Sequence, residues 1–330
     1  MLIRFFKSSF YKQYLVLIII AVLLWLRAYT VPCQPPETTD ISPLFSLLSG
    51  LLPANAVFRL IPALILLLLE AVLLNFILIR HELLPKNSLL GALVFIVLMS
   101  QAPYAICMTP VLCAGIFIIP AFDRIMNTYG KADPTKDVFS AAFLLALASL
   151  FYFPAVFILL LLILSFAIFG TFSVRMLFVT LAGIFAVYLY LFVYYFLFDM
   201  LEGQSCLYIG WISTFAGFKA DYDITQYIVW GMIALLALAA ILHSMSHMNE
   251  WNIMTRKKVL LIIWFMVLVL SVLVYEGDML HNTLMFLAIP LSVLISMYYA
   301  NRKKAGTIME LYFMLLLLAI LINNLLIAEC

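Results

Sequence analysis

Charged residues are scarce in this chain. Only 10% of its 330 residues are Asp, Glu, Lys or Arg, while 67% are hydrophobic. A soluble domain carries about 25% charged residues to cover its surface, so this composition excludes an ordinary soluble protein. Several apolar runs reach the length of about 20 residues that a helix needs to cross a bilayer. We therefore predict an all-α fold, a polytopic transmembrane helical bundle.

Motifs for soluble catalysis are missing as well. The sequence contains no Walker loop, no dinucleotide-binding fingerprint and no G-x-S-x-G nucleophile turn. None of its loops holds more than three basic residues, which does not indicate nucleic-acid binding. No C-x-x-C pair and no metal-ligand spacing occurs among the five cysteines, Cys33, Cys107, Cys113, Cys206 and Cys330. These residues identify no cofactor, and a divalent metal stays as an open alternative.

The apolar stretches predict about 11 helices in one integral membrane domain, residues 1–330. These helices cover residues 14–31, 57–79, 89–108, 110–122, 138–153, 155–169, 176–198, 224–243, 259–275, 284–300 and 310–328. Lys and Arg gather in alternate loops, and short cytoplasmic loops retain positive charge. The N-terminus is therefore placed in the cytoplasm, with loops 80–88, 123–137, 170–175, 244–258 and 301–309. Loops 32–56, 199–223 and 276–283 then face outside.

Two apolar stretches are each compatible with two helical arrangements. Residues 89–122 and residues 138–169 can each form one long helix or a hairpin of two short ones. Pro110 and Pro154 lie near their middles, where proline interrupts the helical hydrogen-bond ladder. The hairpin interpretation also leaves the basic loop 123–137 in the cytoplasm, and we prefer it for that reason.

A polar window interrupts the apolar sequence between Arg27 and Arg59. Its two carboxylates, Glu37 and Asp40, are the candidate catalytic residues, as a general base or as ligands of a metal on a phosphate. The alternative is that Asp40 only caps a short helix over the stripe 41–52, which would lie along the membrane surface. The two arginines either extend to water or hold the phosphate of a lipid substrate in paired hydrogen bonds.

Two further candidate residues, Glu70 and His281, lie outside this window. Glu70 lies well inside the second predicted helix, where a carboxylate must be paired, protonated or facing a wet cavity. It is either a proton-coupling group or a hydrogen-bonded packing residue. His281, beside acidic residues in an outside loop, is a candidate substrate-binding residue or merely a solvated histidine. Cys33 and Cys206 both face outside, so a disulfide between them is left open.

The chain resembles a family of uncharacterised polytopic bacterial inner-membrane proteins. The resemblance is carried by the run DRIMNTYGKADPTKDVFSAAFLLALASLFYFPAVFILLLLILSFAIFG at residues 123–170 and by NFILIRHELLPKNSLLGALVFIVLMS at 75–100. The N-terminal FFKSSFYKQYLVLIIIAVLLWLR at 5–27 fits as well. Most of the first 200 residues are covered. The resemblance implies a multi-pass protein of the bacterial inner membrane and supplies no activity.

The order of features also resembles the GT-C glycosyltransferases, polytopic enzymes that use polyprenyl-phosphate sugars. These enzymes place a catalytic Asp or Glu in the first outside loop, followed by an interfacial helix. Glu37 and Asp40 occupy that place here, and the stripe 41–52 would supply the helix. The first loop is shorter than is usual for them, the adjacent Asp-Glu pair is missing, and no large outside domain follows.

Three functions follow as hypotheses. The first is a GT-C-like glycosyltransferase, or a degenerate relative, that uses a polyprenyl-phosphate-linked sugar among the membrane lipids at the extracytoplasmic face. The second is a non-catalytic scaffold or assembly component of an envelope complex, with a membrane protein as its partner. The third is a proton-coupled transporter that uses Glu70, although no inverted repeat accompanies it.

Overall fold

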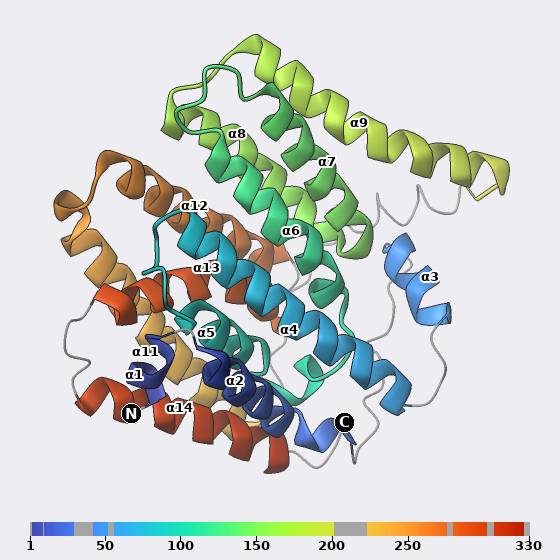
Figure 1. Ribbon diagram of the computed structural model, residues 1–330. Coiled ribbons are helices and arrows are strands. Elements are labelled where there is room, and N and C mark those ends of the chain that lie inside the picture. The colour runs from blue at the N-terminus through green and yellow to red at the C-terminus, as the bar shows by residue number, and fades with distance from the viewer. Residues whose placement is uncertain are drawn as a thin grey trace.

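The computed structural model describes residues 2–8, 10–29, 42–51, 56–200, 223–275, 280–301 and 307–326. Regular structure in these ranges is entirely helical (Figure 1). The 3-10 helices are η1 (Leu26–Tyr29), η2 (Pro103–Ala105), η3 (Phe153–Phe157) and η4 (Met248–Glu250). The α-helices are α1 (Leu2–Phe6), α2 (Tyr11–Leu24), α3 (Pro43–Leu51), α4 (Ala56–Arg80), α5 (Leu90–Met99), α6 (Pro110–Asn127), α7 (Thr135–Phe151), α8 (Ile158–Phe169), α9 (Val174–Leu197), α11 (Ile224–Ser246), α12 (Ile253–Tyr275), α13 (Leu280–Asn301) and α14 (Thr307–Leu326).

Six of these helices are long and apolar enough to cross a membrane: α4, α6, α9, α11, α13 and α14. The prediction of an all-α membrane protein is therefore confirmed. The predicted number of about 11 helices is not matched, because the described ranges contain thirteen α-helices. The short α1 and α3 account for the excess, because neither belongs to the eleven apolar helices counted from the sequence.

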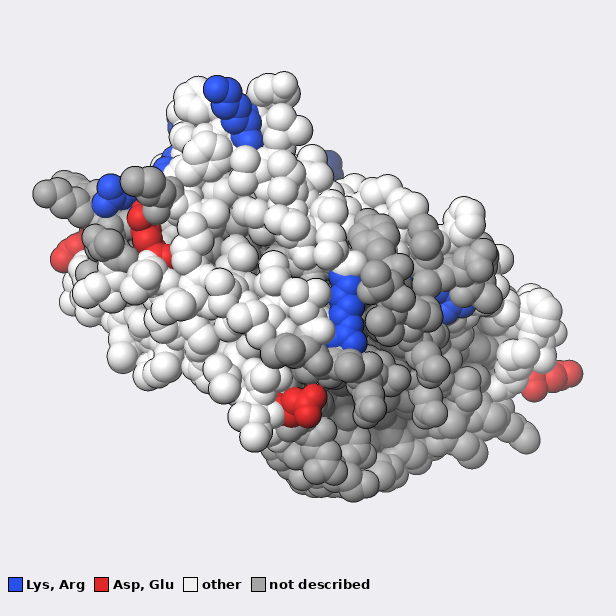
Figure 2. Space-filling view, turned by 90° about the horizontal axis from the view of Figure 1, so that it is seen from below, with Lys and Arg blue, Asp and Glu red and all other residues white. Residues whose placement is uncertain are grey.

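The centre of the bundle is made by α5 and α13. Every residue of α5 is buried, and α13 packs against α5, α11 and α12 (Figure 1). By contrast α9, α11 and α14 bury only a minority of their residues and expose large apolar side chains such as Phe185, Leu235 and Leu311. Figure 2 shows one face on which the described charged side chains are few, with several of them together at one edge. Such apolar faces suit contact with lipid tails.

Both proline-containing stretches form two helices, so neither is the single long helix of the alternative interpretation. Pro110 is the first residue of α6, and the Thr109 hydroxyl accepts a hydrogen bond from the Leu112 amide to cap that helix. Pro154 lies in η3, between α7 and α8. Proline fits these positions because it lacks the N–H that a helix interior needs. The helix predicted over 89–108 is too long, since α5 already ends at Met99.

Helix ends also differ from prediction next to the basic loops. About half of the predicted loop 123–137 is helical, because α6 continues to Asn127 and α7 already begins at Thr135. Their terminal turns accommodate charged residues by pairing them across helices, as described below. The first predicted helix, 14–31, is replaced by α2 and η1, with Trp25 between them.

Candidate functional site

Helix α4 carries ionisable residues at both ends and in its middle. Arg59 lies near its beginning, Glu70 near its centre, and Arg80 and His81 at its end. At 1.5 Å per residue, Glu70 is about 16 Å along the axis from Arg59 and about 16 Å from His81. The three sites are therefore separated from one another by apolar turns of α4.

The two arginines of the predicted site lie at the beginning of α4 and on the neighbouring η1, which packs against α4. An Arg27 Nη1 hydrogen is donated to the Asn324 carbonyl at 2.8 Å. Arg59 Nη2 lies 3.4 Å from the Ser49 carbonyl of α3. Glu37 and Asp40 lie outside the described residues. His281 belongs to α13, but its side chain lies outside the described part as well.

The helix predicted over the stripe 41–52 is present as α3. It packs against α7, and Figure 1 shows it at the edge of the bundle, beside the beginning of α4. Phe45 is buried, whereas Leu47 and Leu51 are exposed. A short helix with one apolar side left exposed at the end of a membrane bundle suits the boundary between lipid and water.

Arg27 belongs to a buried polar cluster that the sequence did not reveal. The Asn324 side chain donates to the Ser100 carbonyl at 3.0 Å, and Trp25 Nε1 donates to the Ser100 hydroxyl at 2.9 Å. Asn323 donates to Gln226 Oε1 at 2.7 Å. These bonds join η1, α5, α11 and α14, and the adjacent asparagines in the apolar α14 were the available signal.

Glu70 is completely buried between α4 and α6, as its sequence position predicted. Within the described part of the chain, neither of its carboxylate oxygens has a hydrogen-bond partner. Gly115 of α6 lies directly against it: a Cβ added there would stand 2.7 Å from Oε1. The carboxyl group thus occupies the space that a side chain at residue 115 would otherwise fill.

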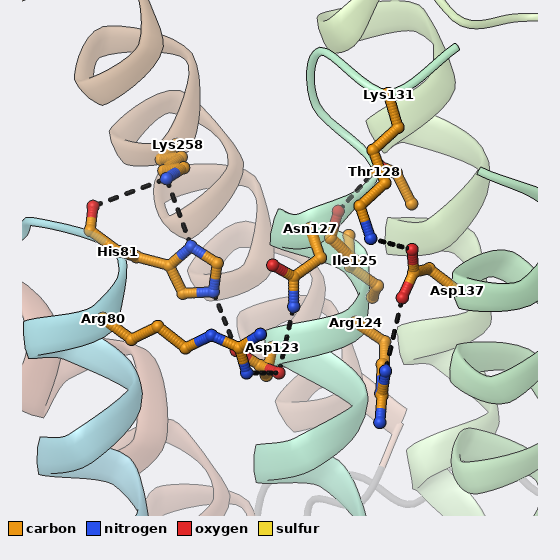
Figure 3. Close-up of polar contacts among 10 residues, drawn as sticks. All are labelled: Arg80, His81, Asp123, Arg124, Ile125, Asn127, Thr128, Lys131, Asp137 and Lys258. Carbon is orange, nitrogen blue, oxygen red and sulfur yellow. Dashed lines mark hydrogen bonds and ion pairs between the residues drawn. The ribbon is translucent and has the colours of Figure 1, made fainter. Parts of the chain in front are cut away.

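Polar side chains of α4, α6 and α12 form a cluster around Asp123 and His81 at the other end of α4 (Figure 3). Asp123 Oδ1 lies 2.8 Å from His81 Nε2, and Asp123 Oδ2 accepts hydrogen bonds from Arg80 at 3.1 Å and Asn127 at 3.0 Å. Lys258 Nζ lies 3.1 Å from His81 Nδ1. An ammonium can only donate, so Nδ1 accepts and Nε2–H donates to Asp123. The imidazole ring therefore lies between a cation and a carboxylate and contacts both.

Lys258 is the most deeply buried cation of this cluster, with none of its surface exposed. It precedes the apolar run of α12, which begins at Val259. Burial lowers the pKa of Lys258 to about 8, against the opposing effect of the carboxylates of Glu82 and Asp123. In the sequence, Arg80 and Lys258 belong to the basic loops 80–88 and 244–258, and no pattern singles out His81. No local pattern could have indicated the cluster, because its partners are far apart along the chain.

Asp137 forms a second charged contact at this end of the bundle (Figure 3). It pairs with Lys131, and its Oδ1 lies 3.4 Å from Arg124 Nη1. Both cations are about half exposed, so these pairs contribute less stability than the buried cluster. They fix the α6–α7 connection and explain why α7 begins earlier than predicted.

Two of the five cysteines, Cys107 and Cys113, lie within the described residues. Cys107 is disulfide-bonded, whereas Cys113 of α6 is buried with a free thiol. Cys33 and Cys206, whose pairing the sequence left open, lie outside the described residues. Within the described ranges, no three His, Cys, Asp or Glu side chains gather in a metal-binding arrangement.

Comparison with known proteins gives one match. No curated protein and no solved structure matches the chain. A family model matches residues 40–327, from Asp40 through Glu70 and the Asp123 cluster to the end of α14. The match extends well beyond the first 200 residues on which the resemblance was founded, and it leaves Arg27 and Glu37 outside. The chain belongs to the family of unknown function DUF6427.

Proposed function

We propose that the protein is a GT-C-like glycosyltransferase of the bacterial inner membrane. It uses a polyprenyl-phosphate-linked sugar as donor. The reacting end of the bundle is formed by η1, α3 and the beginning of α4. This end is extracytoplasmic, because the opposite end holds the basic cluster around Arg80 and Lys258.

The position of α3 is the observation that supports this proposal. A short helix follows the first loop directly and is linked to α4 through the Arg59–Ser49 contact. In GT-C enzymes an interfacial helix occupies the same place in the chain, next to the catalytic loop. The contact keeps Arg59 beside the segment that follows Asp40.

Each expected residue has a distinct part in the chemistry. Arg27 and Arg59 hold the phosphate of the lipid donor, because a guanidinium binds phosphate oxygens through paired hydrogen bonds. Asp40 or Glu37 accepts the proton of the acceptor hydroxyl as that oxygen forms a bond to the anomeric carbon. The bond between that carbon and the phosphate oxygen breaks, and the guanidinium groups stabilise the charge on the leaving polyprenyl phosphate.

The test is replacement of both loop carboxylates by alanine in cells whose only copy carries the change. Glycolipids and glycoproteins are then profiled, with Asp223→Ala as the matched control, an exposed carboxylate at the beginning of α11. We expect the E37A/D40A variant to lose at least one glycan that the D223A variant retains.

Two results would contradict the proposal. Unchanged glycans in the double variant, with full function in the cell, would remove the catalytic role. Purification in mild detergent together with a stoichiometric membrane protein, and without bound lipid phosphate, would favour a scaffold in an envelope complex instead.

A further inference from the structure

Glu70 differs from the other buried carboxylates of the described chain in its surroundings. Asp123, Asp137 and Glu310 each lie within 3.4 Å of a cationic side chain. Glu70 is more deeply buried than any of them, yet its oxygens have no hydrogen-bond partner within the described ranges. An ion pair within the described ranges therefore does not explain how this carboxyl group is tolerated in the apolar interior.

The elements packed around Glu70 present few ionisable groups. On α6, the thiol of Cys113 is close enough to interact with it electrostatically, while Asp123 and Arg124 lie two turns further along and Arg124 pairs with Asp137. Helix α5 has no ionisable residue. The ionisable residues of α2, namely Tyr11, Lys12 and Tyr14, belong to its first turns, and Arg27 of η1 bonds to Asn324. No cation among these groups compensates a negative charge at Glu70.

We propose that Glu70 is an intramembrane proton-binding site and carries its proton while α4 and α6 are packed together. A charged, unpaired carboxylate at this depth would have a large free-energy cost, and binding a proton removes the charge. Gly115 makes the site, because only a residue without a side chain leaves room for the carboxyl group. The proton is the ligand, and the α4–α6 contact encloses it.

This site is independent of the proposed glycosyl transfer. It lies about 16 Å along α4 from Arg59 and is separated from the Asp123 cluster by the buried apolar side chains of Leu74, Ile77 and Leu78. Proton release consequently requires α4 and α6 to separate locally, so the charge state of Glu70 is coupled to the packing of these two helices.

Dicyclohexylcarbodiimide is a suitable probe, because this apolar reagent partitions into membranes and reacts with carboxyl groups in their neutral form. The acid proton moves to a carbodiimide nitrogen, the carboxylate oxygen bonds to the central carbon, and rearrangement gives a stable N-acylurea. The full-length protein in detergent is treated over a pH series, and the adduct is located by peptide mass spectrometry. Glu250→Gln is the control, since Glu250 is exposed on η4.

We expect the adduct on Glu70 at acidic and neutral pH, with a yield that falls about tenfold per pH unit once the group ionises. It disappears in E70Q and persists in E250Q. The G115A variant lowers the yield several-fold, because the added methyl group displaces the carboxyl. Absence of the adduct at acidic pH, or a yield that does not change with pH, would overturn the proposal.

Thermal unfolding of E70Q provides a second measurement that does not depend on access of the reagent. Glutamine is isosteric with a neutral carboxylic acid, so E70Q should unfold within a few degrees of the wild type near neutral pH. A large loss of stability in E70Q would show that Glu70 is ionised and paired, which contradicts a bound proton. The unfolding temperature and the glycan profiles are separate measurements. A failure of the proton-binding proposal can therefore be distinguished from a failure of the proposed transferase function.

Discussion

His81 Nε2 lies 2.8 Å from Asp123 Oδ1 and joins the end of α4 to the end of α6. The same histidine receives a hydrogen bond from Lys258 of α12 through Nδ1. Three helices that are distant in the sequence are thus held by one imidazole ring. The free energy of unfolding should therefore depend on the contacts of this ring.

Replacement of Asp123 by alanine should strongly destabilise the protein. The change leaves His81 and Arg80 without their carboxylate partner, and removal of one partner from a buried charged cluster costs roughly 3–5 kcal/mol. Thermal unfolding in detergent measures the effect. The control is Asp133→Ala, whose exposed carboxylate lies 3.9 Å from Arg175, and it should unfold close to the wild type. Equal stability of the two variants would contradict a supporting role for the cluster.

The lowered pKa of Lys258 predicts a pH dependence. Below pH about 8 this lysine is protonated in both the folded and the unfolded chain, so its burial cost is constant. Between about 8 and the ordinary value of 10.5, the unfolded chain binds more protons than the folded one. The free energy of unfolding contributed by Lys258 therefore rises with pH in this window.

Lys258→Met isolates this contribution, because methionine has similar length and does not titrate. The stability of the wild type relative to K258M should increase from pH about 8 to pH about 10.5, and should stay level below that window. The neighbouring ionisable groups, His81, Glu82, Asp123 and Arg80, are present in both proteins and largely cancel. Parallel pH profiles would show that Lys258 does not titrate in this range.

Close packing of α7 against α9 depends on Gly183. A Cβ added at this residue would lie 2.8 Å from the Ala142 Cβ and 3.0 Å from the Phe139 carbonyl. Gly183→Ala should therefore lower stability by about 1–3 kcal/mol through overpacking. Gly231→Ala in α11 is a matched control, because nothing lies within 4 Å of its added Cβ. It should be neutral or slightly stabilising, since alanine has the higher helix propensity. A G183A variant as stable as G231A would contradict the close approach.

The proposed donor site predicts weaker binding of lipid phosphate when its arginines are removed. Arg27→Ala and Arg59→Ala should each weaken binding of polyprenyl phosphate about tenfold or more, because a hydrogen bond to a charged group contributes about 1.5–3 kcal/mol. Native mass spectrometry with added polyprenyl phosphate measures the bound fraction. Arg175→Ala at the opposite, basic end is the control. Equal weakening in all three variants would indicate non-specific attraction to anionic lipid.

The sequence by itself determined the membrane class, the interruptions at Pro110 and Pro154, the short helix α3 and the burial of Glu70. These properties are local: a run of apolar residues, a missing N–H or one carboxylate in such a run has the same physical consequence whatever surrounds it. Helix ends were less predictable. The terminal turns of α6 and α7 contain charged residues that look like loop until their partners are known.

Only the tertiary structure decided which polar groups meet. Asp123 and His81 are 42 residues apart, and Lys258 and His81 are 177 apart. A charge at a helix end is equally compatible with solvent and with a buried partner, so hydropathy and spacing cannot distinguish the two. The packing of α4 against α6 brought these partners together and gave Glu70 a neighbour without a side chain, because the distance between side chains depends on how helices assemble.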